Sequence, residues 1–264
     1  MSLSPRIRAY DHMLIDLDGC LWLGDDACDG AVDAVTALRE AGKSVLFLTN
    51  DVRHAPEDFV RKLWRLGFQA SIAEVVTVGA AMQYQLAGSG SGSAFVVGSQ
   101  ALVDHVANAG LRVLNRTPFA TRADVVVVGT HEGFDYDELR LAVQAVLRGA
   151  DLVGATRDPV FPMPDGPWPA TGALLAAVEA ATGRTASLVV GKPEPAMYEA
   201  ARDRLGPGRI LAVGDRLDAD VAGARRAGMD SALVLTGGTS AEEAAAADPK
   251  PTHTADSLAA LVLG

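Results

Sequence analysis

One stretch near the N-terminus reads HMLIDLDG over residues 12–19. Its first half is apolar enough for a buried strand, and two acids, Asp16 and Asp18, follow it with a single residue between them. The glycine at position 19 then permits a turn of the chain. Because open α/β sheets bind their ligands at the carboxyl ends of parallel strands, this stretch indicates both a fold class and a site.

Apolar runs and amphipathic segments alternate after this stretch. Strand patterns at 12–17, 44–48 and 75–78 are separated by helix patterns at 30–41 and 56–66. Strand, helix and strand in regular alternation predict a parallel sheet with right-handed crossovers. The predicted fold class is therefore α/β, with a doubly wound, Rossmann-like parallel sheet.

The middle of the chain repeats this alternation after a Gly/Ser-rich connector at 88–93. We expect further strands at 94–97, 123–128 and 152–155, and helices at 101–109, 137–147 and 171–181. The segment 159–169 holds five prolines, which predicts an irregular loop. The middle segment is thus predicted to be a second α/β layer.

Polar motifs stand before and after this middle segment but not within it. A strand at 188–190 is predicted to return the chain to the first sheet and to deliver Lys192, and a strand at 210–213 to deliver Asp215. An inserted domain explains this order better than two consecutive domains. We therefore predict a core of residues 1–81 and 187–264 and an inserted α/β cap at 82–186.

Composition excludes several classes of partner. The chain has 264 residues, a formal net charge of −10 and a pI near 4.9, so it repels polyanions, and we expect no nucleic-acid partner. No apolar run of about 18 residues predicts a membrane span, and we expect a soluble cytoplasmic protein. The two cysteines, Cys20 and Cys28, are expected to be free thiols; Cys20 could line the pocket or be oxidised there.

The two acids after the first strand suit the hydrolysis of a phosphate ester. A carboxylate nucleophile divides this slow reaction into formation and breakdown of an aspartyl-phosphate, and we assign that role to Asp16. Asp18 can protonate the leaving oxygen and then take a proton from the attacking water. Two acids in this spacing also occur in turns and calcium loops, but the motifs downstream favour the catalytic interpretation.

Four carboxylates are predicted to converge on the phosphate dianion: those of Asp16, Asp18, Asp215 and Asp220. Each like-charge pair at about 4 Å costs about 4 kcal/mol at an effective dielectric near 20. A hard divalent cation can offset this, and we predict Mg²⁺ held by the side chains of Asp16 and Asp215 and the carbonyl of Asp18. Asp220 is expected to orient a metal-bound water or the lysine; the alternative for Asp218 and Asp220 is to cap a helix or occupy its first turn.

Three further residues are predicted to bind phosphate. Thr49 and Asn50 end a strand with a hydroxyl, an amide and backbone N–H groups, which contact phosphate oxygens without adding charge. A helix-capping turn is the alternative for this pair. Lys192 stands between Gly191 and Pro193 after an apolar strand, which favours a fixed ammonium that holds phosphate and stabilises the Asp16 carboxylate over a mobile surface lysine.

In their order, these motifs resemble those of the haloacid dehalogenase (HAD) superfamily. They are similar to subfamily IIA, the NagD-like, 4-nitrophenyl phosphatase type, which carries a large α/β cap of type C2 between the second and third motifs. The resemblance implies a Mg²⁺-dependent phosphatase acting on a small phosphorylated metabolite such as a sugar phosphate, phosphoglycolate or glycerol phosphate. It also allows a homodimer formed through the cap. The implied roles match those above for Asp16, Asp18, Thr49, Lys192 and Asp215.

The chain departs from this family pattern at two positions. Cys20 stands where threonine or valine is commoner, and Asp51 where asparagine is commoner. The extra acid at 51 predicts weaker binding of highly anionic substrates. In the cap, Arg157 and Asp158 are predicted to face the leaving group, with surface coverage as the alternative.

Two other functions use similar residues. A receiver-like signalling module also holds an acidic pocket, a phosphoaccepting aspartate, a threonine and a lysine, but it has little use for a second acid two residues on or for a long insertion. A phosphotransferase or mutase of the same superfamily shares the first half-reaction. It differs in the acceptor of the phosphoryl group.

Overall fold

The computed structural model describes residues 3–88, 92–161, 163 and 165–264. Within these ranges the chain forms two compact units. The first comprises residues up to Thr49, Pro56–Val76 and Lys192–Gly264, and the second comprises Asn50–Ala55 and Thr77–Gly191. None of the helices in the described ranges has the length and apolar character needed to cross a membrane.

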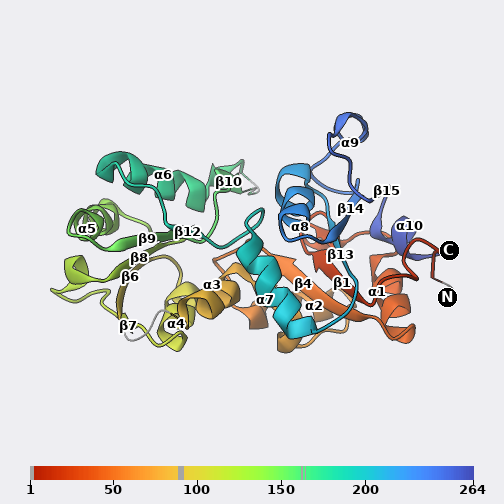
Figure 1. Cartoon of the computed structure of the whole chain (residues 1–264), viewed down its shortest axis with the longest axis horizontal. Helices are drawn as coiled ribbons and strands as arrows, with labels where there is room; N and C mark the ends of the chain where they lie inside the picture. The colour runs from red at the N-terminus through yellow and green to blue at the C-terminus, as the bar shows by residue number, and fades with distance from the viewer. Residues whose placement is uncertain (1–2, 89–91, 162, 164) are drawn as a thin grey trace. The chain divides into compact units, whose positions relative to one another are not determined.

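The first unit is built on a six-stranded sheet in the order β15-β14-β13-β1-β4-β5. Parallel pairing joins β15 through to β4, with β1 in the middle (Figure 1). Its buried residues are the apolar runs of the sequence, such as Met13 and Ile15 on β1 and Phe47 on β4. The strands are β1 (His12–Asp16), β4 (Ser44–Thr49), β5 (Val75–Thr77), β13 (Ile210–Gly214), β14 (Asp230–Val234) and β15 (His253–Ala255).

Helices and one short hairpin complete this unit. One apolar core of this unit includes side chains of β1, β4, α1, α2 and α10. The hairpin pairs β2 (Trp22–Leu23) with β3 (Asp26–Ala27) directly after β1. The helices are α1 (Ala31–Glu40), α2 (Pro56–Arg65), α7 (Pro195–Leu205), α8 (Ala222–Arg226), α9 (Ala241–Ala246) and α10 (Leu258–Val262), with a 3₁₀ turn at Ile72–Glu74 and a π-helical turn at Leu217–Val221.

The second unit has its own parallel sheet of five strands in the order β12-β9-β8-β6-β7. Figure 1 shows α5 and α6 on one side of this sheet and α3 and α4 on the other. The strands are β6 (Ser93–Val97), β7 (Arg112–Val113), β8 (Val125–Val128), β9 (Asp151–Gly154) and β12 (Leu188–Val189). The helices are α3 (Val78–Leu86), α4 (Gln100–Asn108), α5 (Tyr136–Leu147) and α6 (Thr171–Thr182), with a 3₁₀ turn at Ala120–Arg122.

The predicted α/β fold class, with a doubly wound parallel core and a second α/β layer, is confirmed. The expected insertion at 82–186 lies inside the second unit, whose long segment runs from Thr77 to Gly191. Whether this unit acts as a substrate-specificity cap stays a prediction. Part of the predicted connector, residues 89–91, lies outside the described residues.

Three local predictions were wrong. The strand predicted at 188–190 to return the chain to the core pairs instead with β9 as an edge of the second sheet, so the chain leaves that unit only after Gly191. The proline-rich segment contains a short antiparallel ribbon of β10 (Val160–Phe161) and β11 (Trp168–Pro169), and is not wholly irregular. Val78, predicted to end a strand, begins α3, because the Thr77 side chain caps that helix by accepting from the Ala80 N–H.

Candidate active site

Asp16 ends the central strand of the first sheet. In the parallel register it lies opposite Leu48, so Thr49 emerges at the same edge of the sheet. On the other side Ile15 pairs with Val213, which brings the segment around Asp215 to that edge too. Residues far apart in the chain therefore meet where three parallel strands end.

Lys192 joins two of the predicted acids. Its ammonium donates to Asp16 Oδ1 at 2.6 Å and to Asp220 Oδ1 at 2.6 Å, and all but 5% of its surface is buried. Burial acts to lower the pKa of Lys192, but the carboxylates of Asp16 and Asp220 outweigh it and hold that pKa well above its ordinary value. The lysine is therefore a fixed positive charge at the tip of β1.

Three glycines, Gly19, Gly237 and Gly238, pack closely around the Asp215 carboxylate. Gly238 donates its backbone N–H to Asp215 Oδ2 at 2.6 Å. A Cβ atom at Gly19 would lie 2.3 Å from the same oxygen, and one at Gly237 would lie 2.1 Å from it. Gly19 also has a φ of +81°, so both the turn and the close approach require glycine there. The sequence interpretation missed the pair at 237–238, although two glycines soon after the apolar run of β14 are a signal of close backbone approach.

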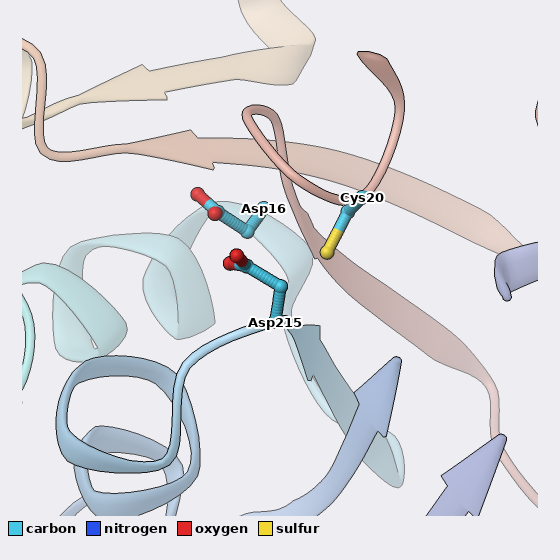
Figure 2. Close-up of side chains that lie close together, drawn as sticks. All are labelled: Asp16, Cys20 and Asp215. Carbon is cyan, nitrogen blue, oxygen red and sulfur yellow. The ribbon is translucent and has the colours of Figure 1, made fainter. Parts of the chain in front are cut away.

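Asp16 and Asp215 together form a candidate cation site. One ligand atom each of Asp16, Asp215 and Cys20 lie within 4.8 Å of one another, and Figure 2 shows the two carboxylates side by side with the Cys20 sulfur directed toward them. Burial raises the pKa of both carboxyls, and the neighbouring Asp220 raises both further. Burial also raises the pKa of the Cys20 thiol, as do the nearby carboxylates.

The charges in this region fit a divalent cation. Asp16, Asp215 and Asp220 are three buried or half-buried carboxyls near one ammonium, that of Lys192. With all four groups ionised the cluster carries a net charge of −3 + 1 = −2, which a divalent ion neutralises. Carboxylate oxygens are the ligands that Mg²⁺ takes in proteins, whereas a protonated thiol is not.

Asp18 lies beside this cluster and is exposed. The buried indole of Trp22, at the start of the hairpin, donates from Nε1 to Asp18 Oδ1 at 2.7 Å. The sequence alone left Trp22 open between the pocket entrance and the core. It is fully buried in the core of the first unit, and its one polar atom holds the predicted acid/base residue.

Asp218 and Asp220, only two positions apart, have different environments. Asp220 is buried, binds Lys192 and accepts the backbone N–H of Arg216 at 3.1 Å. Asp218 is exposed and pairs with the Arg216 side chain at 2.9 Å. The contact of Asp220 matches its predicted orientation of the lysine, while Asp218 is a first-turn carboxylate, as in the alternative drawn from the sequence.

The remaining predicted residues are described by contacts within their own units. Thr49 is buried at the end of β4. Asn50 begins the second unit and donates from Nδ2 to Asp158 Oδ2 at 2.8 Å. Arg157 pairs with Glu179 on α6 at 3.0 Å, an interaction that favours surface coverage for Arg157. Roles for Asn50 and Asp158 toward a ligand stay predictions.

The unusual acid at position 51 is neutralised within its own loop. Arg53 binds both carboxylate oxygens of Asp51, at 3.1 Å and 2.8 Å, and His54 lies 3.0 Å from the second of them. Burial alone would raise the pKa of Asp51, but the hydrogen bonds from His54 and Arg53 bring it far below its ordinary value. Asp51 is therefore paired with positive or polar partners in its own loop, and the predicted weaker binding of highly anionic substrates stays a prediction.

Comparison with known proteins identifies the family. A model described as haloacid dehalogenase-like hydrolase matches residues 13–112, and a HAD-hydrolase-like model matches residues 189–261. Mouse chronophin is 38% identical over 270 residues, which cover 96% of this chain and 92% of that protein. This chain belongs to the haloacid dehalogenase-like hydrolases.

Solved structures of this family share both units. A glycerol phosphate phosphatase from Mycobacterium tuberculosis, solved with magnesium, superposes with a TM-score of 0.91 at 36% identity, over 99% of this chain and 79% of the other. A p-nitrophenyl phosphatase from Archaeoglobus fulgidus superposes with a TM-score of 0.88 at 28% identity, over 96% and 98%. The predicted resemblance to the NagD-like, 4-nitrophenyl phosphatase type is confirmed.

Proposed function

We propose that this hydrolase is a Mg²⁺-dependent phosphatase of small phosphomonoesters that works through an aspartyl-phosphate on Asp16. The observation that carries the proposal is the close grouping of the Asp16, Lys192 and Asp215 side chains. A carboxylate at the end of a central strand is bound to a buried ammonium at 2.6 Å and lies within 4.8 Å of a second carboxylate. This combination supplies a nucleophile, a fixed positive charge and cation ligands at one point.

In the first step, an oxygen of Asp16 attacks phosphorus and the ester oxygen leaves. Asp18 is exposed and close by, so it can give the leaving oxygen a proton. The Trp22 indole keeps one Asp18 oxygen in place, which leaves the other for proton transfer. In the second step Asp18 takes a proton from water, the water oxygen attacks phosphorus, and the bond between phosphorus and the Asp16 oxygen breaks, which releases inorganic phosphate and restores the Asp16 carboxylate.

Lys192 has two tasks in this scheme. Its positive charge opposes the effect of burial by acting to lower the pKa of Asp16, and its ammonium opposes the charge that develops on the phosphoryl oxygens. Asp220 holds the ammonium from the opposite side. Thr49 and Asn50 are proposed to contact phosphate oxygens.

The residues fit a Mg²⁺ ion, which the side chains of Asp16 and Asp215 and the backbone carbonyl of Asp18 would hold. When bound, the ion supplies charge neutralisation between the carboxylates and the phosphate. The Gly238 N–H on Asp215 Oδ2 and the glycines around it fix the orientation of this ligand.

Relatives named for glycerol phosphate and for sugar phosphates support a small phosphorylated metabolite as the substrate. A net charge of −10 is unfavourable for nucleic acid as a partner. We also propose that the 82–186 segment determines specificity through Asp158, whereas the pair of Arg157 with Glu179 favours a surface role for Arg157. A homodimer is part of the same proposal, and gel filtration tests it. The cytoplasmic location stays a prediction.

A panel of phosphate esters tests the function. With Mg²⁺, the chain is expected to release inorganic phosphate from small monoesters such as glycerol phosphate and 4-nitrophenyl phosphate, and a chelator is expected to reduce the rate strongly. Added alcohols distinguish a phosphotransferase, because they would collect the phosphoryl group in place of water. No phosphate release from any ester in the presence of Mg²⁺ would reject the proposal.

A further inference from the structure

A buried thiol beside the two carboxylates has no role in the proposed hydrolysis. The Cys20 side chain is fully buried, and its sulfur lies within 4.8 Å of a ligand oxygen of Asp16 and of Asp215. Across the ranges that the structure describes, the Cys20 sulfur makes no hydrogen bond. Three side chains that can each bind a metal thus lie close together (Figure 2).

These three ligands, two carboxylates and one thiol, suit a different cation from Mg²⁺. Mg²⁺ takes oxygen ligands, whereas thiolate sulfur selects softer ions such as Zn²⁺, which also accept carboxylate oxygens. Tetrahedral bonds of about 2.3 Å to sulfur and about 2.1 Å to oxygen place neighbouring ligand atoms roughly 3.6 Å apart. Because the ligand atoms lie within 4.8 Å of one another, they would have to approach by at most roughly 1.2 Å to reach this spacing.

We propose that Asp16, Cys20 and Asp215 form a site for thiophilic divalent cations of the Zn²⁺ and Cd²⁺ class. When such an ion binds, a metal–sulfur bond forms, the thiol proton passes to solvent, and one oxygen of each carboxylate completes three of four tetrahedral positions. Water takes the fourth. The family's commoner threonine or valine at this position would leave the site without its sulfur ligand.

Binding of a soft cation at this site is expected to inhibit the phosphatase activity, an expectation that rests on the proposed function. The soft cation takes the Asp16 carboxylate and the Asp215 ligand at once, so it displaces Mg²⁺ and blocks the nucleophile. Inhibition by Zn²⁺ or Cd²⁺ is therefore expected to be reversed by a chelator and weakened by excess Mg²⁺.

The test is a titration of the metal-free, reduced full chain with Cd²⁺, followed by the ultraviolet charge-transfer absorption of the cadmium–thiolate bond. One equivalent of Cd²⁺ is expected to produce the band, and Mg²⁺ is expected to shift the midpoint to higher Cd²⁺. The Cys20→Ser protein is expected to lose the band and to bind Cd²⁺ roughly tenfold or more weakly. Cys28→Ser is the matched control, because Cys28 is the chain's other cysteine and lies outside the three-residue cluster; it is expected to keep the band.

Loss of the band in Cys28→Ser together with its retention in Cys20→Ser would overturn the proposal, and so would a midpoint that Mg²⁺ does not move. Should Cys20→Ser fail to fold, the ¹¹³Cd NMR signal of the wild-type chain decides: a shift typical of one sulfur with oxygens supports the site, and a shift typical of oxygens alone rejects it. Neither readout uses a substrate, so a chain without phosphatase activity would still give a clear answer.

Discussion

Asp218 and Asp220 are only two positions apart, but they differ strongly in burial and in the residues that they contact. Asp220 is buried against Lys192, and Asp218 is an exposed partner of Arg216. Asp220→Asn removes one of two carboxylates that fix the ammonium, and we expect kcat to fall about 10- to 100-fold. Steady-state kinetics with 4-nitrophenyl phosphate measure this.

Asp218→Asn is the matched control, and we expect its kcat to stay within about twofold of the wild-type value, because exposed ion pairs contribute little. Equal losses in both variants would mean that the contact between Asp220 and Lys192 has no part in the reaction.

The positions of the main site residues could be predicted from the sequence, but their side-chain contacts could not. Asp16, Lys192 and Asp215 each follow an apolar run, and strand ends are where a parallel sheet gathers its polar side chains. The hydrogen bond from Trp22 to Asp18 could not be predicted, because it depends on the path of the hairpin β2–β3. The neutralisation of Asp51 by Arg53 depends in the same way on side-chain orientation within one loop.

At the scale of elements, long periodic segments were predicted well and short ones poorly. The helices α1, α2 and α5 lie within one residue or so of their predicted bounds. The strand β12 has only two residues, and an apolar pair carries no information about which sheet it joins. The ribbon β10–β11 forms despite its prolines, since it is short, with two residue pairs among the described residues, and Pro169 lies at the end of its strand.

The loop Asn50–Ala55 contains a mostly buried acid, Asp51, that both Arg53 and His54 contact. Asp51 is only 15% exposed and Arg53 22%, so we expect Asp51→Asn to lower the free energy of unfolding by about 1–3 kcal/mol at pH 7. Because the folded-state pKa of Asp51 is lowered, its contribution is present above the unfolded value near 3.9 and decreases as the pH falls below it. The decrease in the free energy of unfolding caused by Asp51→Asn should therefore be smaller at pH 3 than at pH 7.

Urea denaturation at the two pH values measures this difference, with Asp137→Asn as the control. Asp137 forms an exposed pair with Arg140 in the same unit, and its substitution is expected to cost no more than about 0.5 kcal/mol. A larger loss for Asp51→Asn at pH 3 than at pH 7 would contradict the lowered pKa.

At the scale of the whole molecule, the cation site links stability to pH. The pKa values of Asp16 and Asp215 are raised by burial and by neighbouring carboxylates. Their contribution to the stability of the metal-free chain is therefore fully present below about pH 3.9 and is lost as the pH rises through the raised folded values. Mg²⁺ binds the ionised carboxylates, so the increase in Tm that it causes should be larger at pH 7.5 than at pH 5.

Thermal unfolding with Mg²⁺ and with a chelator at both pH values measures this effect. At 100 times its Kd the ion is expected to stabilise the chain by about 2.7 kcal/mol, and Asp215→Asn should remove most of that gain. A Mg²⁺-dependent increase that is equal or larger at pH 5 would speak against carboxylates with raised pKa values as the ligands.

The proposed reaction requires the phosphoryl group to pass through Asp16, and rapid quenching with a ³²P-labelled phosphomonoester can trap that intermediate. With Mg²⁺ present, label is expected on the peptide that contains Asp16, to be released by hydroxylamine and to be absent in Asp16→Asn. Steady hydrolysis by the wild-type chain with no label on that peptide, or hydrolysis retained in Asp16→Asn, would contradict the account.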